Sequence, residues 1–135
     1  MESNYEILRK FGLEQEENIK GILEESFETS LFKTLGRYNS FDFIDEEKNL
    51  YVEVKSRQNL KDAYPSTMIG WNKLEEALKL IKEDKIVFLV FNFTDKICVH
   101  QVTKINDTWK QVDRYNPNKI NYLIPVNELE EIYEY

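Results

Sequence analysis

Residues 41–55 read FDFIDEEKNLYVEVK, and this stretch decides which fold the chain can adopt. Apolar and polar side chains alternate over 41–45 and again over 50–55, which is the pattern of half-buried β-strands. The polar stretch 46–49 between them has the length of a hairpin tip. We therefore predict an antiparallel hairpin with a four-residue tip.

This register makes a geometric prediction for three charged side chains. With 46–49 as the tip, Phe43 faces Val52 and Asp42 faces Glu53 across the hairpin. Because side chains alternate along a strand, Lys55 lies on the same face as Glu53. The other face should pack against the core with five apolar side chains: Phe41, Phe43, Leu50, Val52 and Val54.

The remaining elements are predicted from hydrophobic periodicity. Helical spacing predicts helices over 13–30, over 67–84 with Ser66 or Thr67 as its cap, and over 126–133 with Asn127 as its cap. Apolar runs predict strands over 31–35, with a break at Gly36, over 86–93 as a buried central strand, over 97–105, and over 122–125 as a short edge segment closed by Pro125. This order predicts an α/β fold with a mixed sheet flanked by helices on both faces.

Length and composition limit the class of protein. The 135 residues contain no repeat and no linker, so we expect a single domain over 1–135. The longest apolar run is far shorter than the roughly 20 residues of a membrane helix, and the N-terminus lacks the features of a signal peptide. Cys98 is the single cysteine, which excludes an internal disulfide, and with His100 alone beside it a structural zinc site is excluded too. We expect an intracellular protein of a reducing compartment, cytoplasmic or nuclear, with no membrane partner.

Charge is unevenly distributed along the chain. The net charge is −7, which argues against a general nucleic-acid coat protein. Residues 51–123, however, contain 12 basic and 9 acidic side chains, between two acidic ends. Such a chain can approach a phosphate backbone on one face only. An acidic surface without a polyanionic partner is the competing interpretation.

The facing carboxylates suggest a metal site. Two carboxylates about 5 Å apart at Cβ repel each other unless a cation or a proton lies between them. Hard oxygen ligands suit Mg²⁺ or Mn²⁺, and Lys55 on the same face can orient a metal-bound water. The alternative is an exposed sheet face with an ordinary Glu and Lys, and spacing alone does not separate the two interpretations.

The motif also resembles a known superfamily. Asp42, ten further residues and then Glu53-Val54-Lys55-Ser56-Arg57 resemble the core motif of the PD-(D/E)XK nucleases, which include type II restriction enzymes, Holliday-junction resolvases and phage exonucleases. Gly12 to Glu16 is similar to the Gly-x-x-x-Glu opening of the first helix in the resolvase-like branch. Phe41 stands where the name-giving proline would be. The resemblance implies a restriction-endonuclease-like α-β-β-β-α-β core.

By this resemblance Asp42 and Glu53 would ligate Mg²⁺, for which Mn²⁺ can substitute, with the Val54 carbonyl as a further ligand. Lys55 would assist the attacking water, and Glu16 would complete the site. The helix pattern supports Glu16 independently, because it is the glutamate that projects near the apolar sector. A solvated Glu at the rim of that sector is the competing interpretation, and Glu17 is the alternative residue.

Five further residues are candidates for substrate binding. Arg57 continues the Glu53 face and is suited to clamp a phosphate, although it is equally ordinary as a surface arginine. Lys61, Tyr64 and Thr67, with Ser66, lie in the segment that follows the strand, where bases and hydroxyls can meet a DNA backbone; a plain connecting loop is the alternative. Lys73 lies near the start of the second helix, as in relatives where a Lys or Gln supports the site, or it snorkels to solvent.

The preferred functional hypothesis is a Mg²⁺-dependent endo- or exodeoxyribonuclease. DNA is the expected partner, with branched and single-stranded forms among the candidates, and a homodimer is compatible with the sequence. Two alternatives stay open. One is a catalytically silent nuclease-fold module that binds a protein partner, and the other is an RNase with the same site.

Overall fold

In a computed structural model of the protein, the hairpin forms with the predicted register. β2 (Phe43–Asp45) pairs antiparallel with β3 (Leu50–Ser56), and Phe43 lies opposite Val52. At the tip, Asp45 Oδ1 accepts hydrogen bonds from the backbone N–H groups of Asn49 (2.8 Å) and Leu50 (3.1 Å). The aspartate therefore holds the turn that sets the register of the motif.

The structure describes residues 3–34, 41–47, 49–113 and 120–135. The predicted break at Gly36 and the tip residue Lys48 lie outside these ranges. The chain divides into two compact units, Met1–Leu31 and Phe32–Tyr135, and each is described by itself. The single-domain organisation stays a prediction.

The N-terminal unit is dominated by α1 (Asn4–Phe27). The helix begins well before the predicted residue 13 because the Ser3 side chain caps it, accepting a hydrogen bond from the N–H of Glu6 at 3.2 Å. It ends before the predicted residue 30 because Glu28 adopts a left-handed conformation with φ 54°. Across the described part of the chain, no helix has the length and apolar content needed to cross a bilayer.

The larger sheet has six strands in the order β1-β2-β3-β5-β6-β9. Its other members are β1 (Leu31–Lys33), β5 (Ile86–Asn92), β6 (Lys96–Val102) and β9 (Glu130–Glu134). β3 and β5 are parallel, whereas the pairs β2–β3, β5–β6 and β6–β9 are antiparallel. The apolar run 86–93 thus forms the buried central strand that its sequence predicts.

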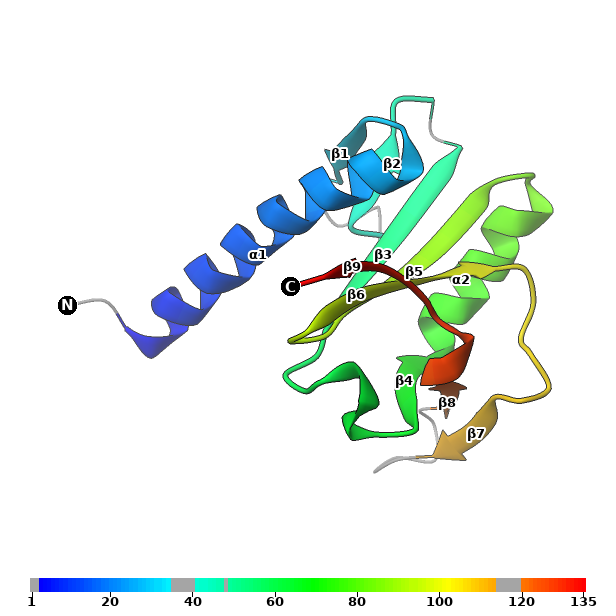
Figure 1. Ribbon diagram of the computed structural model, residues 1–135. Helices are drawn as coiled ribbons and strands as arrows, with labels where there is room; N and C mark the ends of the chain where they lie inside the picture. Colours follow the sequence, from blue (N-terminus) through cyan, green and yellow to red (C-terminus); the bar gives the residue numbers. More distant parts are fainter. Residues whose placement is uncertain (1–2, 35–40, 48, 114–119) are drawn as a thin grey trace. The chain divides into compact units, whose positions relative to one another are not determined.

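A smaller sheet and one helix complete the second unit (Figure 1). The sheet has the order β4-β8-β7, with β4 (Ser66–Gly70), β7 (Lys110–Asp113) and β8 (Ile120–Pro125). The helix α2 (Trp71–Lys82) contacts β5 of the larger sheet and β4 and β8 of the smaller one. Short 3₁₀ turns, η1 (Lys61–Ala63) and η2 (Val126–Glu128), lie in the connections. The fold is mixed α/β, as predicted.

The principal corrections concern two predicted helical segments. Residues 66–70 form the strand β4 instead of the start of the second helix, because buried Thr67 and Ile69 alternate with their neighbours and pair with β8. The helix begins at Trp71 after an extended Gly70, without a side-chain cap. Residues 126–133 form η2 and β9 instead of a helix, because β6 provides an antiparallel partner for Glu130–Glu134.

The prediction that residues 122–125 lie at the edge of a sheet was wrong. They belong to β8, which is the middle strand of the small sheet, between β4 and β7. Pro125 is tolerated because it is the last residue of the strand, opposite Ser66. β7 had no clear sequence signal and was not predicted.

The face of β3 that carries Glu53 also borders a hydrophobic core, and the prediction that Phe41 packs on the opposite face was wrong. Glu53 pairs in register with Leu89, and Lys55 with Phe91, so these side chains share one face of the sheet. Leu89 and Phe91 belong to a large hydrophobic cluster that includes Leu74 and Ala77 of α2. Phe41 joins the same cluster and contacts Tyr51 edge to face at 5.8 Å. Glu53 therefore lies at the border of a core.

Because residues 66–70 form a strand, we expect its buried side chains to contribute more to the free energy of unfolding than exposed side chains of the same type. Ile69 is 1% exposed, so Ile69→Ala should lower the free energy of unfolding by about 2–5 kcal/mol. The matched control is Ile86→Ala, at a side chain that is 44% exposed, with an expected loss under about 1 kcal/mol. Urea denaturation of both variants measures the difference, and equal losses would contradict the assignment of β4.

Candidate active site

Glu53 lies in the middle of β3 and is 4% exposed. Its carboxylate lies between two lysines. Lys73 Nζ is 2.8 Å from Glu53 Oε2, and Lys55 Nζ is 3.6 Å from Glu53 Oε1. The contact between Lys73 Nζ and Glu53 Oε2 is a close ion pair. Lys55 thus lies beside Glu53, on the face that the strand alternation predicts.

Lys73 reaches this site from the first turn of α2. Its ammonium group also lies 5.0 Å from the centre of the Phe41 ring, which allows a cation–π interaction. The side chain is 17% exposed. Lys73 was a candidate for substrate binding or for support of the site, and the structure places its charge against the buried carboxylate of Glu53, which it can neutralise and orient.

Asp42 lies just before β2 and is bonded to the backbone of β3 on the side that faces β2. Its N–H donates to the Val52 carbonyl at 2.9 Å, and its Oδ2 accepts the N–H of Val54 at 2.7 Å. In an extended strand the N–H and C=O groups of one residue point to the same side. The carbonyl of Val54 is therefore directed toward the Asp42 side of β3, as a shared ligand set with Asp42 requires.

The electrostatics of Glu53 reflect its surroundings. Burial raises the pKa of the Glu53 carboxyl to about 6, and the contact with Lys73 opposes this shift. The negative charge of Asp42 raises the pKa further, so the two carboxylates interact. Asp42 and Glu53 are the residues that could hold a cation, because a positive charge near both would offset their repulsion and the cost of burying Glu53.

The described site has two acidic side chains. Within the ranges described above, no three His, Cys, Asp or Glu side chains gather at one point. The side chain of Glu16 is outside the described part, and its helix belongs to the N-terminal unit, so its predicted role stays a prediction. Glu17, the alternative, is exposed on that helix.

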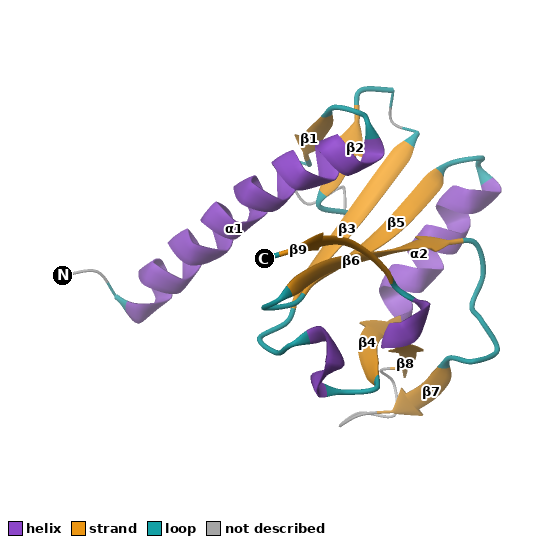
Figure 2. Ribbon diagram, in the orientation of Figure 1, coloured by secondary structure: helices purple, strands orange, loops and turns teal. Residues whose placement is uncertain are grey.

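Four of the predicted substrate residues come together in one groove of about 580 Å³. The groove lies where β3 ends and the loop with η1 begins. Figure 2 shows the course of the chain from β3 through this loop to β4. Its polar wall contains Arg57, Asn59, Lys61, Tyr64, Ser66 and Thr67. Lys73 is not part of it. The groove begins two residues beyond Lys55 on the same strand.

Arg57 lines this groove. Its Nε donates to Thr67 Oγ1 at 3.2 Å, and its Nη2 donates to the Met68 carbonyl at 2.6 Å. Its guanidinium also lies 5.8 Å from the centre of the Phe91 ring. Burial lowers the pKa of Arg57. The arginine therefore links β3 to β4 through neutral acceptors.

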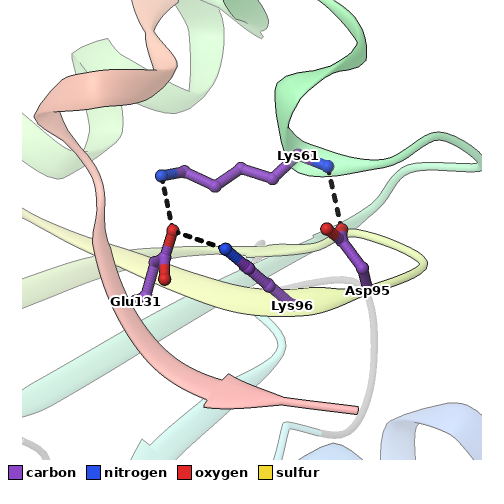
Figure 3. Close-up of polar contacts among 4 residues, drawn as sticks. All are labelled: Lys61, Asp95, Lys96 and Glu131. Carbon is purple, nitrogen blue, oxygen red and sulfur yellow. Dashed lines mark hydrogen bonds and ion pairs between the residues drawn. The ribbon is translucent and has the colours of Figure 1, made fainter.

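Lys61 is fixed by contacts that the sequence did not reveal (Figure 3). Its Nζ lies 2.8 Å from Glu131 Oε1, which also accepts from Lys96 Nζ at 3.1 Å. The backbone N–H of Lys61 donates to Asp95 Oδ1 at 2.9 Å. Glu131 was predicted to lie in a terminal helix, and its partners are distant in sequence, so local patterns gave no signal for this network.

The raised pKa of Glu53 predicts a stability change in metal-free protein. The folded state has the higher pKa, about 6 against 4.5, so it binds the proton more tightly between these values. The stability of wild type relative to Glu53→Gln should therefore be greatest below pH 4.5 and should fall by about 2 kcal/mol as the pH rises past 6. Urea unfolding in EDTA from pH 4 to pH 7.5 measures this difference; parallel curves would show that the carboxyl is not desolvated.

Comparison with known proteins agrees with the motif. A family model described as phage putative PDDEXK endonuclease matches residues 3–125, which include the hairpin, Glu53, Lys55 and all residues that line the groove except Val126. No curated protein and no solved structure matches the chain. The resemblance predicted from Asp42 and Glu53-Val54-Lys55 is thereby confirmed at the level of the superfamily. The chain belongs to this phage family of PD-(D/E)XK endonucleases.

Proposed function

We propose that the protein hydrolyses phosphodiester bonds of DNA with a divalent cation held by Asp42 and Glu53. The observation that carries this proposal is the hydrogen bond that the Asp42 carboxylate accepts from the N–H of Val54, the residue between Glu53 and Lys55. Family membership supports a nuclease activity. The metal, the substrate and the role of each residue are our inference from the site.

The chemistry of the donor set suits Mg²⁺, with Mn²⁺ as a substitute. Asp42 and Glu53 offer carboxylate oxygens, and Val54 offers a backbone carbonyl, which are hard ligands of the kind that these cations prefer. A cation bound here would lower the pKa of a coordinated water and stabilise charge on the phosphate. Glu16 is a further candidate ligand.

Lys55 is suited to act on the reacting groups. Its ammonium is held 3.6 Å from Glu53, yet its side chain is 39% exposed, so it faces the ligands and the solvent together. In this position it can orient the attacking water and stabilise negative charge as the new P–O bond forms and the old one breaks. Lys73 is more buried and neutralises Glu53, so we assign it a positioning role.

DNA is the proposed substrate. Two alternative functions are compatible with some of the same observations. An RNase would use the same site, and a catalytically silent module would retain the fold without turnover. The basic and hydroxyl side chains of the groove beyond Lys55 favour a nucleic-acid substrate over a protein partner. The intact set of Asp42, Glu53 and Lys55 favours an active enzyme.

Lys55→Ala should reduce cleavage by about 100-fold or more, because it removes a group that acts in the transition state. Wild type and variant would be incubated with supercoiled, linear, single-stranded and four-way-junction DNA and with RNA, in Mg²⁺, Mn²⁺ and EDTA. Lys79→Ala is the matched control, since Lys79 is 69% exposed on α2, and it should cleave like wild type. Equal cleavage by Lys55→Ala, or no cleavage of any substrate by wild type, would refute the proposed chemistry.

The cation site itself can be tested without turnover. Mn²⁺ should raise the melting temperature of wild type, because a ligand that binds only the folded state stabilises it. Asp42→Asn should lose this gain, whereas Asp45→Asn should keep it. Asp45 lies in the same hairpin but serves the tip, where it accepts from Asn49 and Leu50. Identical Mn²⁺ shifts in both variants would exclude Asp42 as a ligand.

A further inference from the structure

We infer that the groove at the end of β3 binds an unpaired segment of a DNA strand, next to the phosphate that is cleaved. This inference rests on the proposed function and makes its substrate more specific. It is argued from the charge of the groove, its position relative to Lys55, its exposed aromatic side chain and the contacts that fix its wall.

The charge of the groove is opposite to that of the chain. Its lining contains Arg57 and Lys61 and no Asp or Glu, although the net charge of the protein is −7. The hydrogen bonds of Arg57 end on the neutral oxygens of Thr67 and Met68. Its positive charge is therefore partly desolvated without being neutralised by these contacts, which favours the binding of an anion such as a phosphodiester.

The position of the groove aligns it with the proposed catalytic residues. The Arg57 N–H donates to the Asn92 carbonyl at 2.9 Å, so the extended ladder between β3 and β5 continues through this residue. Lys55 and Arg57 are thus two residues apart on one face, or about 6.6 Å along the strand. A phosphate at Lys55 and the neighbouring nucleotide at Arg57 can be held by consecutive side chains of the same strand.

Part of the lining of the groove suits a base instead of a phosphate. Tyr64 lines the groove and is 63% exposed, and Phe93, Leu123 and Val126 add apolar side chains to the lining. An exposed aromatic ring beside cationic and hydroxyl groups is the usual platform for stacking the bases of single-stranded DNA. A base inside a duplex cannot reach such a platform without leaving its stack. The groove therefore favours unpaired nucleotides.

The wall of the groove is held in place by the rest of the fold. Lys61 is bound through its side chain to Glu131 and through its backbone to Asp95 (Figure 3). The Asn59 carbonyl accepts the N–H of Thr94 at 3.1 Å, and the Pro65 carbonyl accepts the N–H of Val126 at 3.0 Å. These contacts pre-organise the loop, so binding a strand does not require it to be ordered first.

The test is a binding measurement in EDTA, where no metal-dependent cleavage occurs. Fluorescence anisotropy with a labelled oligothymidylate of about 12 nucleotides should show tighter binding than with a duplex of equal length. Tyr64→Ala should weaken single-strand binding by about tenfold through loss of stacking. Lys61→Ala should weaken it too, because it removes a cation from the lining of the groove.

The chain supplies matched controls for both variants. Lys96→Ala removes the same charge and the same Glu131 contact as Lys61→Ala, but Lys96 does not line the groove, so affinity should change by less than about twofold. Tyr133→Ala removes another exposed tyrosine, on β9, and should behave like wild type. Since Tyr64 is at the surface, its variant keeps the test valid if Lys61→Ala fails to fold.

The outcomes separate this inference from the proposed function. Equal effects of the groove variants and their controls, or preferred binding of duplex, would overturn the groove assignment even if Mg²⁺-dependent cleavage is observed. Tighter binding of oligouridylate than of oligothymidylate would overturn the choice of DNA. Loss of single-strand binding in the groove variants alone would support the inference, even if wild type cleaves nothing and the proposed chemistry fails.

Discussion

The buried carboxylate of Glu53 is the constraint on which the rest of the second unit depends. β3 pairs in parallel with β5, and the face that carries Glu53 borders the hydrophobic cluster of β5 and α2. A carboxylate at the centre of β3 is unstable there unless a positive group comes to it. Lys73 supplies that group from the first turn of α2, which ties the placement of the helix to the placement of the site. Removing Lys73 alone would leave a buried charge without its main partner.

The part of the site that the sequence could predict is the part that is local. A four-residue tip and strict alternation were sufficient to pair Phe43 with Val52 and to bring Lys55 beside Glu53. Alternation failed at Phe41, which packs with Tyr51 on the side of the large cluster. The burial of Glu53 was not predictable from the hairpin, because it is caused by β5 and α2, which follow much later in the chain.

The errors in the fold have the same physical origin. Residues 66–70 and 126–133 have patterns that are compatible with a helix, and local propensity is a weak determinant when a strand partner is available. β8 provides that partner for β4, and β6 provides it for β9. In β9, Glu131 is held by Lys61 and Lys96, which are far away in sequence. Glu131, whose sequence context is typical of the first turns of a helix, therefore belongs to an ion network between residues distant in sequence.

The same network bears on how an acidic protein can engage a polyanion. Glu131 pairs with Lys61, which lines the groove, and with Lys96, which does not, whereas Arg57 in the groove is bonded to neutral oxygens. Of the two cations in the lining, Arg57 is therefore the one whose charge these contacts do not offset. Since non-specific duplex binding grows with the number of phosphates that cations neutralise, such a surface should hold duplex DNA weakly in general. Binding would then depend on a strand that fits the groove, so the net charge of −7 favours discrimination between substrates and does not argue against a nucleic-acid target.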